Sequence, residues 1–241
     1  MKRIVQEAAK ILGVNVERLK KSPETEFEVG RVFLDQYQRA QERTQSFSTD
    51  DLLPQQRHHT LFQLIGQTDL TRGDIVEYGC FRGLSANQIA AQVKLSEAGS
   101  RMFIFDSFEG LSDYKTEDFL DGKVKYMADR RQQFACGEDI VRRNLREFSF
   151  IDYRQGWIPS RFPDVDGRHF AFVHIDVDLY EPVCDSPEFM YPRMATGGAI
   201  VFDDYECLTF PRANKAVDEC MAGRKDFSLT LLSGEAFLVK A

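Results

Sequence analysis

The sequence predicts a Rossmann-like α/β fold: a doubly wound, mostly parallel seven-stranded sheet with an N-terminal helical extension and a C-terminal antiparallel hairpin. After Gly73, short apolar segments of β character alternate with amphipathic helical segments, which is typical of a parallel sheet covered by helices on both faces. A glycine-containing turn follows the first of these segments, and aspartates end two later ones. Ligands of such folds bind at the carboxyl ends of the strands, so these residues mark the expected site.

Residues 1–72 are predicted to form a helical extension that acts as a lid, and residues 73–241 to form the main domain. Apolar residues recur at helical spacing in residues 4–12, and the same character returns in residues 33–40 and 57–65. Breaks are expected at Ser22-Pro23 and across residues 51–54.

The main domain divides into strands and helices in regular order. Strands are expected at residues 74–79, 101–107, 151–157, 169–177 and 197–204, and helices at residues 84–93, 137–148, 181–194 and 211–223. Pro187 is expected to kink the third of these helices or to separate its first part, because proline removes an internal hydrogen bond. Two short β segments around Ser233-Gly234 predict the closing hairpin.

Residues 109–134 lack clear periodicity and carry many charges. A loop of this length in a compact domain is more often an active-site cover or a disordered excursion than scaffold. We therefore expect acceptor specificity to come from this loop and from residues 37–62.

Composition and charge limit the classes of function that the chain can have. The chain has 241 residues, of which 43% are hydrophobic and 29% charged, so it can bury one large core. The net charge of −7 argues against nucleic acid and anionic membranes as partners. Five cysteines without a CxxC pair predict neither a disulfide framework nor a zinc site. The first residues are too polar for a signal sequence, and no apolar run reaches membrane-spanning length, so we expect a cytoplasmic protein.

Three aspartates stand where apolar strands end: Asp176 after one, and Asp203 and Asp204 after the next. The gap of 27 and 28 residues fits one strand, helix and strand, so the two strand ends can converge. A single aspartate here is explained by a polar strand end. Three carboxylates with no Cys or His beside them favour Mg²⁺, whose octahedron is completed by water or substrate oxygens.

The glycine turn argues for a cofactor without phosphates. Gly79 and Gly83 allow the backbone to approach a ligand at a helix N-terminus, but GCFRGLS lacks the second close glycine that admits a pyrophosphate. Glu77 inside the motif favours a cofactor that presents a cation or an amine, such as S-adenosylmethionine.

Two further positions suit that cofactor. Asp106 ends the second predicted strand, where an acid accepts hydrogen bonds from ribose hydroxyls, although it can equally cap a turn. Gly156 and Trp157 end the third strand and offer backbone and an aromatic face to an adenine, although Trp157 can equally be a core aromatic.

The segments EYGCFRGLS, FDSFEGL, VRRNL, QGW, HIDVDLYEP, YPRMATGGAIVFDDY and PRANKAVDE follow one another as in the macrocin O-methyltransferase family, which this chain resembles over roughly residues 53–218. The resemblance implies an S-adenosylmethionine- and Mg²⁺-dependent enzyme that methylates a hydroxyl of a small molecule, typically a deoxysugar of a natural product, and it favours a homo-oligomer. It implies Asp176, Asp203 and Asp204 as metal ligands. It also places near the methyl donor Glu77, Gly79, Phe81, Gly83, Ser85, Asp106, Ser107, Phe108, Gly156 and Trp157.

Three positions depart from the family pattern. Phe81 and Val177 replace a frequent Trp and Gly, and Cys136-Gly137 stand where a Ser commonly faces the adenine.

Asp176 is the candidate general base, because it would lie nearest both to the metal and to the attacking hydroxyl. The distantly similar catechol O-methyltransferases use a lysine three residues after the first metal aspartate, where this chain has Leu179. A metal-bound hydroxide is the alternative, and Asp178 is a weaker candidate. His174, within an apolar run, is expected to be a core histidine.

Two other functions are alternatives to methyl transfer. IDVD is also an Asp-x-Asp metal motif of nucleotide-sugar glycosyltransferases, although such enzymes do not require Glu77, Gly79 or the Asp203-Asp204 pair. AAKILGVNVERLKK resembles a carrier-protein helix, which would suit a non-catalytic scaffold. The glycine motif and the second aspartate pair favour methyl transfer.

Overall fold

A seven-stranded sheet organises the fold, with the strand order β3-β2-β1-β4-β5-β7-β6. The computed structural model describes residues 23–46, 52–119, 131–205, 212–223, 226–231 and 233–241. Strands β1 to β5 are parallel, and β7 lies antiparallel between β5 and β6. The strands are β1 Asp74–Tyr78, β2 Met102–Asp106, β3 Ile151–Gln155, β4 Phe170–Ile175, β5 Met194–Phe202, β6 Phe227–Thr230 and β7 Ala236–Val239. The predicted doubly wound sheet and closing hairpin are confirmed.

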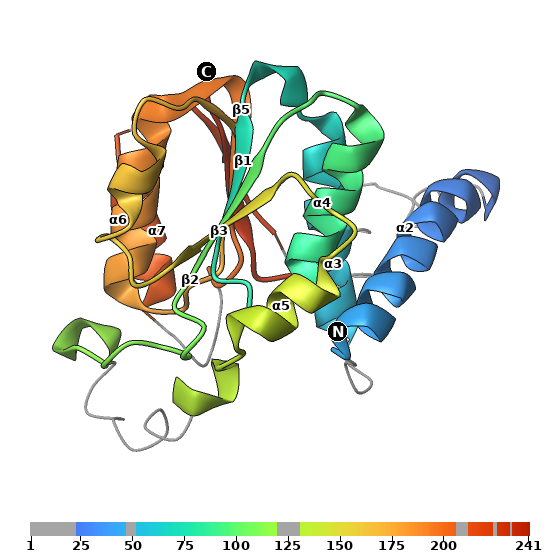
Figure 1. The fold of residues 1–241 in the computed structure, drawn as a ribbon. Coiled ribbons are helices and arrows are strands. Elements are labelled where there is room, and N and C mark those ends of the chain that lie inside the picture. The colour runs from blue at the N-terminus through green and yellow to red at the C-terminus, as the bar shows by residue number, and fades with distance from the viewer. Residues whose placement is uncertain (1–22, 47–51, 120–130, 206–211, 224–225, 232) are drawn as a thin grey trace, which may run out of the picture. The chain divides into compact units, whose positions relative to one another are not determined.

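Helices cover both faces of the sheet (Figure 1). On one face lie α3 (Leu52–Gln67), α4 (Leu84–Ser96) and α5 (Glu138–Asn144); on the other lie α6 (Tyr180–Met190) and α7 (Ala213–Met221). No helix in the described part of the chain is both long and apolar enough to cross a membrane.

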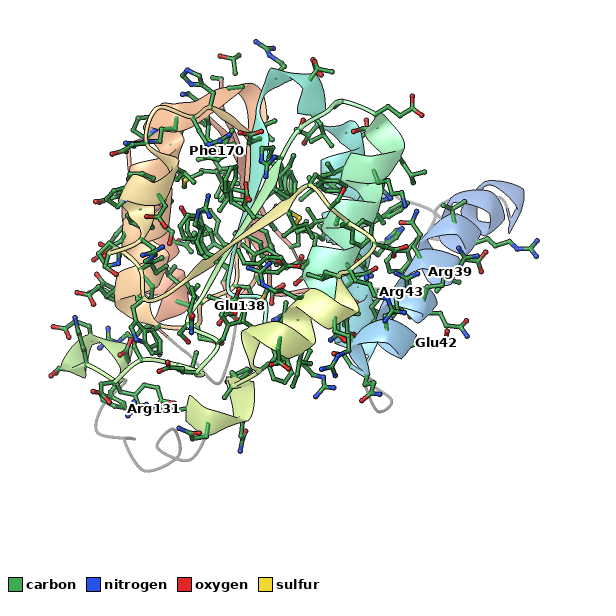
Figure 2. The ribbon with its side chains drawn as sticks, viewed as in Figure 1. Arg39, Glu42, Arg43, Arg131, Glu138 and Phe170 are labelled. Atoms are coloured by element: carbon green, nitrogen blue, oxygen red, sulfur yellow. The ribbon has the colours of Figure 1, made fainter. Side chains whose placement is uncertain are left out.

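Alternation along the strands fills two separate cores. Ile75 of β1 belongs to the cluster beneath α3 and α4, whereas its neighbour Val76 belongs to the cluster beneath α6 and α7. Phe170 of β4 lies among the packed side chains of this second cluster (Figure 2). Each buried strand therefore reads as a continuous apolar run, because both of its faces are covered.

The chain forms two compact units, residues 1–38 and 39–241. Helix α2 (Pro23–Thr44) begins in the first unit and ends in the second. The helix predicted at residues 4–12 lies outside the described residues. The division into residues 1–72 and 73–241, with the first part as a lid, stays a prediction.

Several predicted boundaries were wrong by a few residues. The helix predicted at 181–194 ends at Met190 and passes into a 3-10 turn over Tyr191–Arg193, because Pro192 has no N–H to continue the α-helical hydrogen bonds; β5 then begins at Met194. The helix is not divided at Pro187, which lies within it. Likewise α3 begins at Leu52, so Pro54 lies in its first turn, where proline is tolerated. Helix α5 is also shorter than predicted.

Gly79 joins the ends of three strands. Its N–H donates to the carbonyl of Phe105 at the end of β2 (2.9 Å), while the N–H of Asp176 donates to Tyr78 at the end of β1 (2.9 Å). Gly79 has a φ of +78°, and a Cβ placed on it would lie 1.8 Å from the carbonyl oxygen of Asp176. Only glycine permits both this conformation and this approach.

We expect Gly79→Ala to destabilise the protein more than Gly99→Ala. Gly99 has a similar φ of +75° but open space around it, so alanine there adds only backbone strain, about 1–2 kcal/mol. Alanine at position 79 adds overlap with backbone, about 1–3 kcal/mol further. Urea unfolding followed by circular dichroism measures both free energies of unfolding. Equal losses would mean that the contact with Asp176 is not the constraint.

Candidate active site

A pocket opens at the carboxyl edge of the sheet, beside the glycine turn. The segment after β4 contributes Asp176, Asp178 and Leu179 to its wall. Predicted cofactor residues that line the same pocket are Gly79, Phe81, Asp106, Ser107, Gly156 and Trp157. The structure therefore brings most of the predicted donor residues and one predicted metal ligand to a single cavity.

Asp106 fixes the shape of the glycine turn. Its Oδ2 accepts hydrogen bonds from the N–H groups of Cys80 (2.7 Å) and Phe81 (3.3 Å), and its Oδ1 accepts one from Phe108 (2.7 Å). The capping role considered for Asp106 is thus observed. A carboxylate has about four lone-pair sites, so these bonds leave capacity for ribose hydroxyls.

Apolar side chains form the outer part of the pocket. Phe81 meets Phe134 edge-on, with ring centroids 6.1 Å apart, and Leu179 packs against the cluster that includes Leu111 and Phe134. Leu111 and Phe134 belong to the loop predicted to cover the site, of which residues 109–119 and 131–134 are described. Trp157 is 42% exposed, so it is not a core aromatic.

Four predicted donor residues do not line this pocket. Glu77 is fully buried, with Oε1 3.0 Å from Nδ1 of His174. Gly83 caps α4 with a φ of +88°, Ser85 follows in its first turn, and Phe108 belongs to the core. Their proximity to a methyl donor stays a prediction.

Three carboxylates gather within ligating distance of one another: Asp176, Asp178 and Asp204 offer oxygens that all lie within 4.8 Å. Oδ2 of Asp204 is buried and has no hydrogen-bond partner among the described residues. Two of the three predicted metal ligands therefore meet, together with Asp178. Strand β4 ends at Ile175 and Asp178 has a φ of +60°, so the chain turns and strand alternation does not set its direction.

Asp203, the other predicted metal ligand, lies outside this group. Its Oδ2 accepts a hydrogen bond from Nη1 of Arg57 on α3 (2.9 Å), and its Oδ1 is 3.9 Å from Nε2 of His174. Sequence analysis did not foresee Arg57. Only the register of α3 against the sheet places it here.

Burial, and then mutual repulsion, raise the pKa of two carboxylates in the group. Burial, then the charges of Asp203 and Asp204, raise the pKa of Asp176 well above its ordinary value. Burial and Asp203 raise the pKa of Asp204 to about 6. By contrast, burial would raise the pKa of Asp203, but His174 and Arg57 outweigh it and lower that pKa to about 2. Negative charge concentrated in this way fits a bound cation.

His174 lies between two acids, as a core histidine with polar partners. Burial alone would lower its pKa, but the carboxylates of Asp203 and Glu77 outweigh burial and raise the pKa well above its ordinary value. His174 therefore adds positive charge beneath the cluster.

The fold and this site define a Rossmann-like protein with a cofactor pocket and an acidic cluster at the carboxyl edge of its sheet. The model of the macrocin O-methyltransferase family (TylF) matches residues 12–226. The chain belongs to this family.

Relatives with described activities are O-methyltransferases. Demethyldecarbamoylnovobiocin O-methyltransferase of Streptomyces niveus is 29% identical over 155 residues, which cover 62% of this chain and 58% of the relative. The 8-demethyl-8-(2,3-dimethoxy-alpha-L-rhamnosyl)-tetracenomycin-C 4'-O-methyltransferase of Streptomyces olivaceus is 26% identical over 160 residues, 64% of this chain and 58% of the relative. The chain thus spans under two thirds of the length of either.

Solved structures share the fold. The O-methyltransferase NovP superposes with a TM-score of 0.68 at 24% identity, covering 77% of this chain and 79% of NovP.

Glu235 is a buried acid at the start of β7, next to this region. It is 1% exposed, and its Oε2 accepts a hydrogen bond from the Ser233 hydroxyl (2.7 Å). Burial, and then the charge of Asp203, raise its pKa from 4.5 to about 8. The folded state thus holds this proton more tightly than the unfolded state does.

We expect Glu235→Gln to make stability less dependent on pH. A raised folded-state pKa gives wild type a stabilising contribution that is complete below about pH 4.5 and lost as the pH rises to about 8. The neutral variant does not undergo this loss. The free energy of unfolding of the variant minus that of wild type should therefore be a few kcal/mol higher at pH 8.5 than at pH 5, at about 1.4 kcal/mol per pKa unit. Urea unfolding at both pH values measures this, with exposed Glu219→Gln as control. The same difference at both values would contradict the expectation.

Proposed function

We propose that this protein is a Mg²⁺-dependent O-methyltransferase that moves the methyl group of S-adenosylmethionine to a hydroxyl of a small molecule. The observation that carries the proposal is that Asp176 and Asp178 share one pocket with Gly79, Asp106 and Trp157. A donor held by the glycine turn would thus lie beside carboxylates that can take up a proton and hold a cation, close enough for an acceptor hydroxyl to be aligned with the methyl group.

The donor would be bound by backbone and aromatic groups. Asp106 would accept hydrogen bonds from ribose hydroxyls while it holds the glycine turn. Trp157 would offer a face to the adenine. Phe81 and Phe134 would close the pocket over the donor and exclude water. The other predicted donor contacts, including that of Glu77, belong to the same proposal.

The acidic cluster would hold the metal. Asp176, Asp203 and Asp204 are the proposed ligands. Two observations support a cation there: these carboxylates repel one another, and Oδ2 of Asp204 has no hydrogen-bond partner in the described part of the chain. Bound Mg²⁺ supplies charge that lowers the pKa of the acceptor hydroxyl and aligns it. Asp178 is the competing third ligand, because one of its carboxylate oxygens lies within 4.8 Å of an oxygen of Asp176 and of an oxygen of Asp204.

Asp176 is the proposed general base. It lines the pocket that would hold the donor, so it would lie next to the hydroxyl whose proton must be removed. Asp178 lines the same pocket and is the alternative.

The acceptor would be a deoxysugar or polyol of a natural product. The names of the relatives describe a novobiocin precursor and a rhamnosyl tetracenomycin as their substrates, which supports a glycosylated antibiotic precursor. The glycosyltransferase alternative finds no support in these relatives. The scaffold alternative depends on residues 8–21, which lie outside the described residues. Homo-oligomeric assembly and a cytoplasmic location stay predictions.

Incubation of the protein with Mg²⁺, methyl-labelled S-adenosylmethionine and a panel of glycosylated natural products tests the activity. Mass spectrometry should find one labelled methyl on one class of acceptor, and EDTA should abolish the transfer. Calorimetry should detect S-adenosylhomocysteine binding. Binding of a nucleotide sugar in its place would overturn the proposal.

We expect Asp204→Asn to raise the Mg²⁺ concentration needed for half-maximal rate by about 100-fold or more, because it removes a proposed ligand. Asp204 does not line the donor pocket, so affinity for S-adenosylhomocysteine should stay within about twofold. Exposed Asp139→Asn is the matched control. Initial rates against Mg²⁺ concentration provide the measurement, and an unchanged Mg²⁺ requirement would exclude Asp204 as a ligand.

The same measurement distinguishes Asp203 from Asp178 as the third ligand. Asp203→Asn should raise the Mg²⁺ requirement. If Asp178→Asn does so and Asp203→Asn does not, the third ligand is Asp178.

A further inference from the structure

We propose that Arg57 is a positioning residue that fixes the Asp203 carboxylate at the edge of the acidic cluster and so sets the affinity of the cation site. The inference rests on the proposed function, because it concerns the metal named there. It adds a residue from α3, a helix that contributes nothing to the wall of the donor pocket.

Arg57 makes two directed contacts at once. Its Nη1 donates to Oδ2 of Asp203 (2.9 Å), and its Nε donates to the carbonyl of Ser233 (3.0 Å). The side chains of Arg57 and Asp203 are only 24% and 20% exposed. A planar guanidinium with both contacts made is locked in orientation, and it locks the carboxylate in turn.

Asp203 is held from other directions as well. Its N–H donates to the carbonyl of Ile175 at the end of β4 (3.0 Å), which ties its backbone to the strand that precedes Asp176. Its second oxygen, Oδ1, lies 3.9 Å from Nε2 of His174, whose Nδ1 is 3.0 Å from Oε1 of Glu77. A buried polar row thus runs from β1 through β4 to β5 and ends at Arg57.

This row leaves Asp203 with one oxygen committed and one available. Oδ2 is taken by Arg57, whereas Oδ1 lies 3.9 Å from Nε2 of His174, which is too far for a hydrogen bond. An arginine that holds one oxygen of a ligand carboxylate leaves the other for the ion and prevents the carboxylate from turning away. Without Arg57, a half-buried Asp203 next to Asp204 would lose the hydrogen bond that holds its Oδ2.

Two roles for Arg57 predict opposite signs. If Arg57 acted only as a positive charge, it would repel a cation, and its removal would tighten Mg²⁺ binding. If it positions Asp203, its removal weakens Mg²⁺ binding even though repulsion is relieved. The sign of the change therefore separates the two roles.

Calorimetric titration of the full chain with Mg²⁺ tests the proposal. We expect Arg57→Gln to weaken Mg²⁺ binding on the order of tenfold. Arg57→Lys keeps the charge but cannot make both contacts, so it should weaken binding as well. Arg143→Gln removes the same charge from an exposed side chain of α5 and should change nothing. Affinity for S-adenosylhomocysteine should stay within about twofold in all variants.

A double-mutant cycle shows whether Arg57 acts through Asp203. In the Asp203→Asn background, Arg57→Gln should weaken Mg²⁺ binding by less than about twofold further, because the carboxylate to be positioned is gone. Thermal unfolding checks that each variant is folded. If Arg57→Gln does not fold, Arg57→Lys takes its place in the measurement.

The outcomes separate this inference from the proposed function. Unchanged or tighter Mg²⁺ binding in Arg57→Gln, with wild type binding Mg²⁺ normally, overturns the positioning role alone. Absence of Mg²⁺ binding in wild type overturns the metal site, and the positioning role with it.

Discussion

The site depends on the close approach of the Gly79 backbone to the carbonyl of Asp176. This contact fixes the end of β1 against the end of β4, so the turn that would hold a methyl donor and the first carboxylate of the cluster cannot move independently. Asp106 extends the same constraint to β2, because it ends that strand and its Oδ2 accepts hydrogen bonds from two N–H groups of the turn. Three neighbouring strand ends therefore share one geometry, which backbone atoms largely determine.

Concentrated negative charge is the second constraint. Four carboxylates follow β4 and β5, and the protein balances them unequally: Asp203 has Arg57 and His174 beside it, whereas Asp176 and Asp204 have raised pKa values. Buried carboxylates with raised pKa values need a bound cation or a proton to neutralise their charge. Arg57 and His174 thus hold Asp203 in place, whereas the charges of Asp176 and Asp204 are left for a ligand to balance.

Sequence analysis predicted the sheet, its order of elements and the edge where the site lies, because apolar runs, glycines and strand-end aspartates are local signals. The structure brings Gly79, Asp106 and Trp157 to one pocket, because all three stand at strand ends on the same edge of the sheet. The contact of Glu77 with His174 could not be predicted, because it depends on how β1 and β4 pair, and the contact of Glu77 with a donor stays a prediction. Asp178 and Arg57 could not be placed. The first depends on a turn with positive φ, and the second on how α3 docks 146 residues away in sequence from its partner.

The position of β7 between β5 and β6 also bears on how the site is assembled during synthesis. The parallel strands β1 to β5 can pair as the chain emerges, but the edge of β5 that pairs with β7 stays open until β7 has been synthesised. Ser233, which anchors Arg57, lies in the turn before that strand. The acidic cluster is therefore present in a nascent chain before its support is complete, and the site becomes rigid only once Ser233 and β7 have been synthesised.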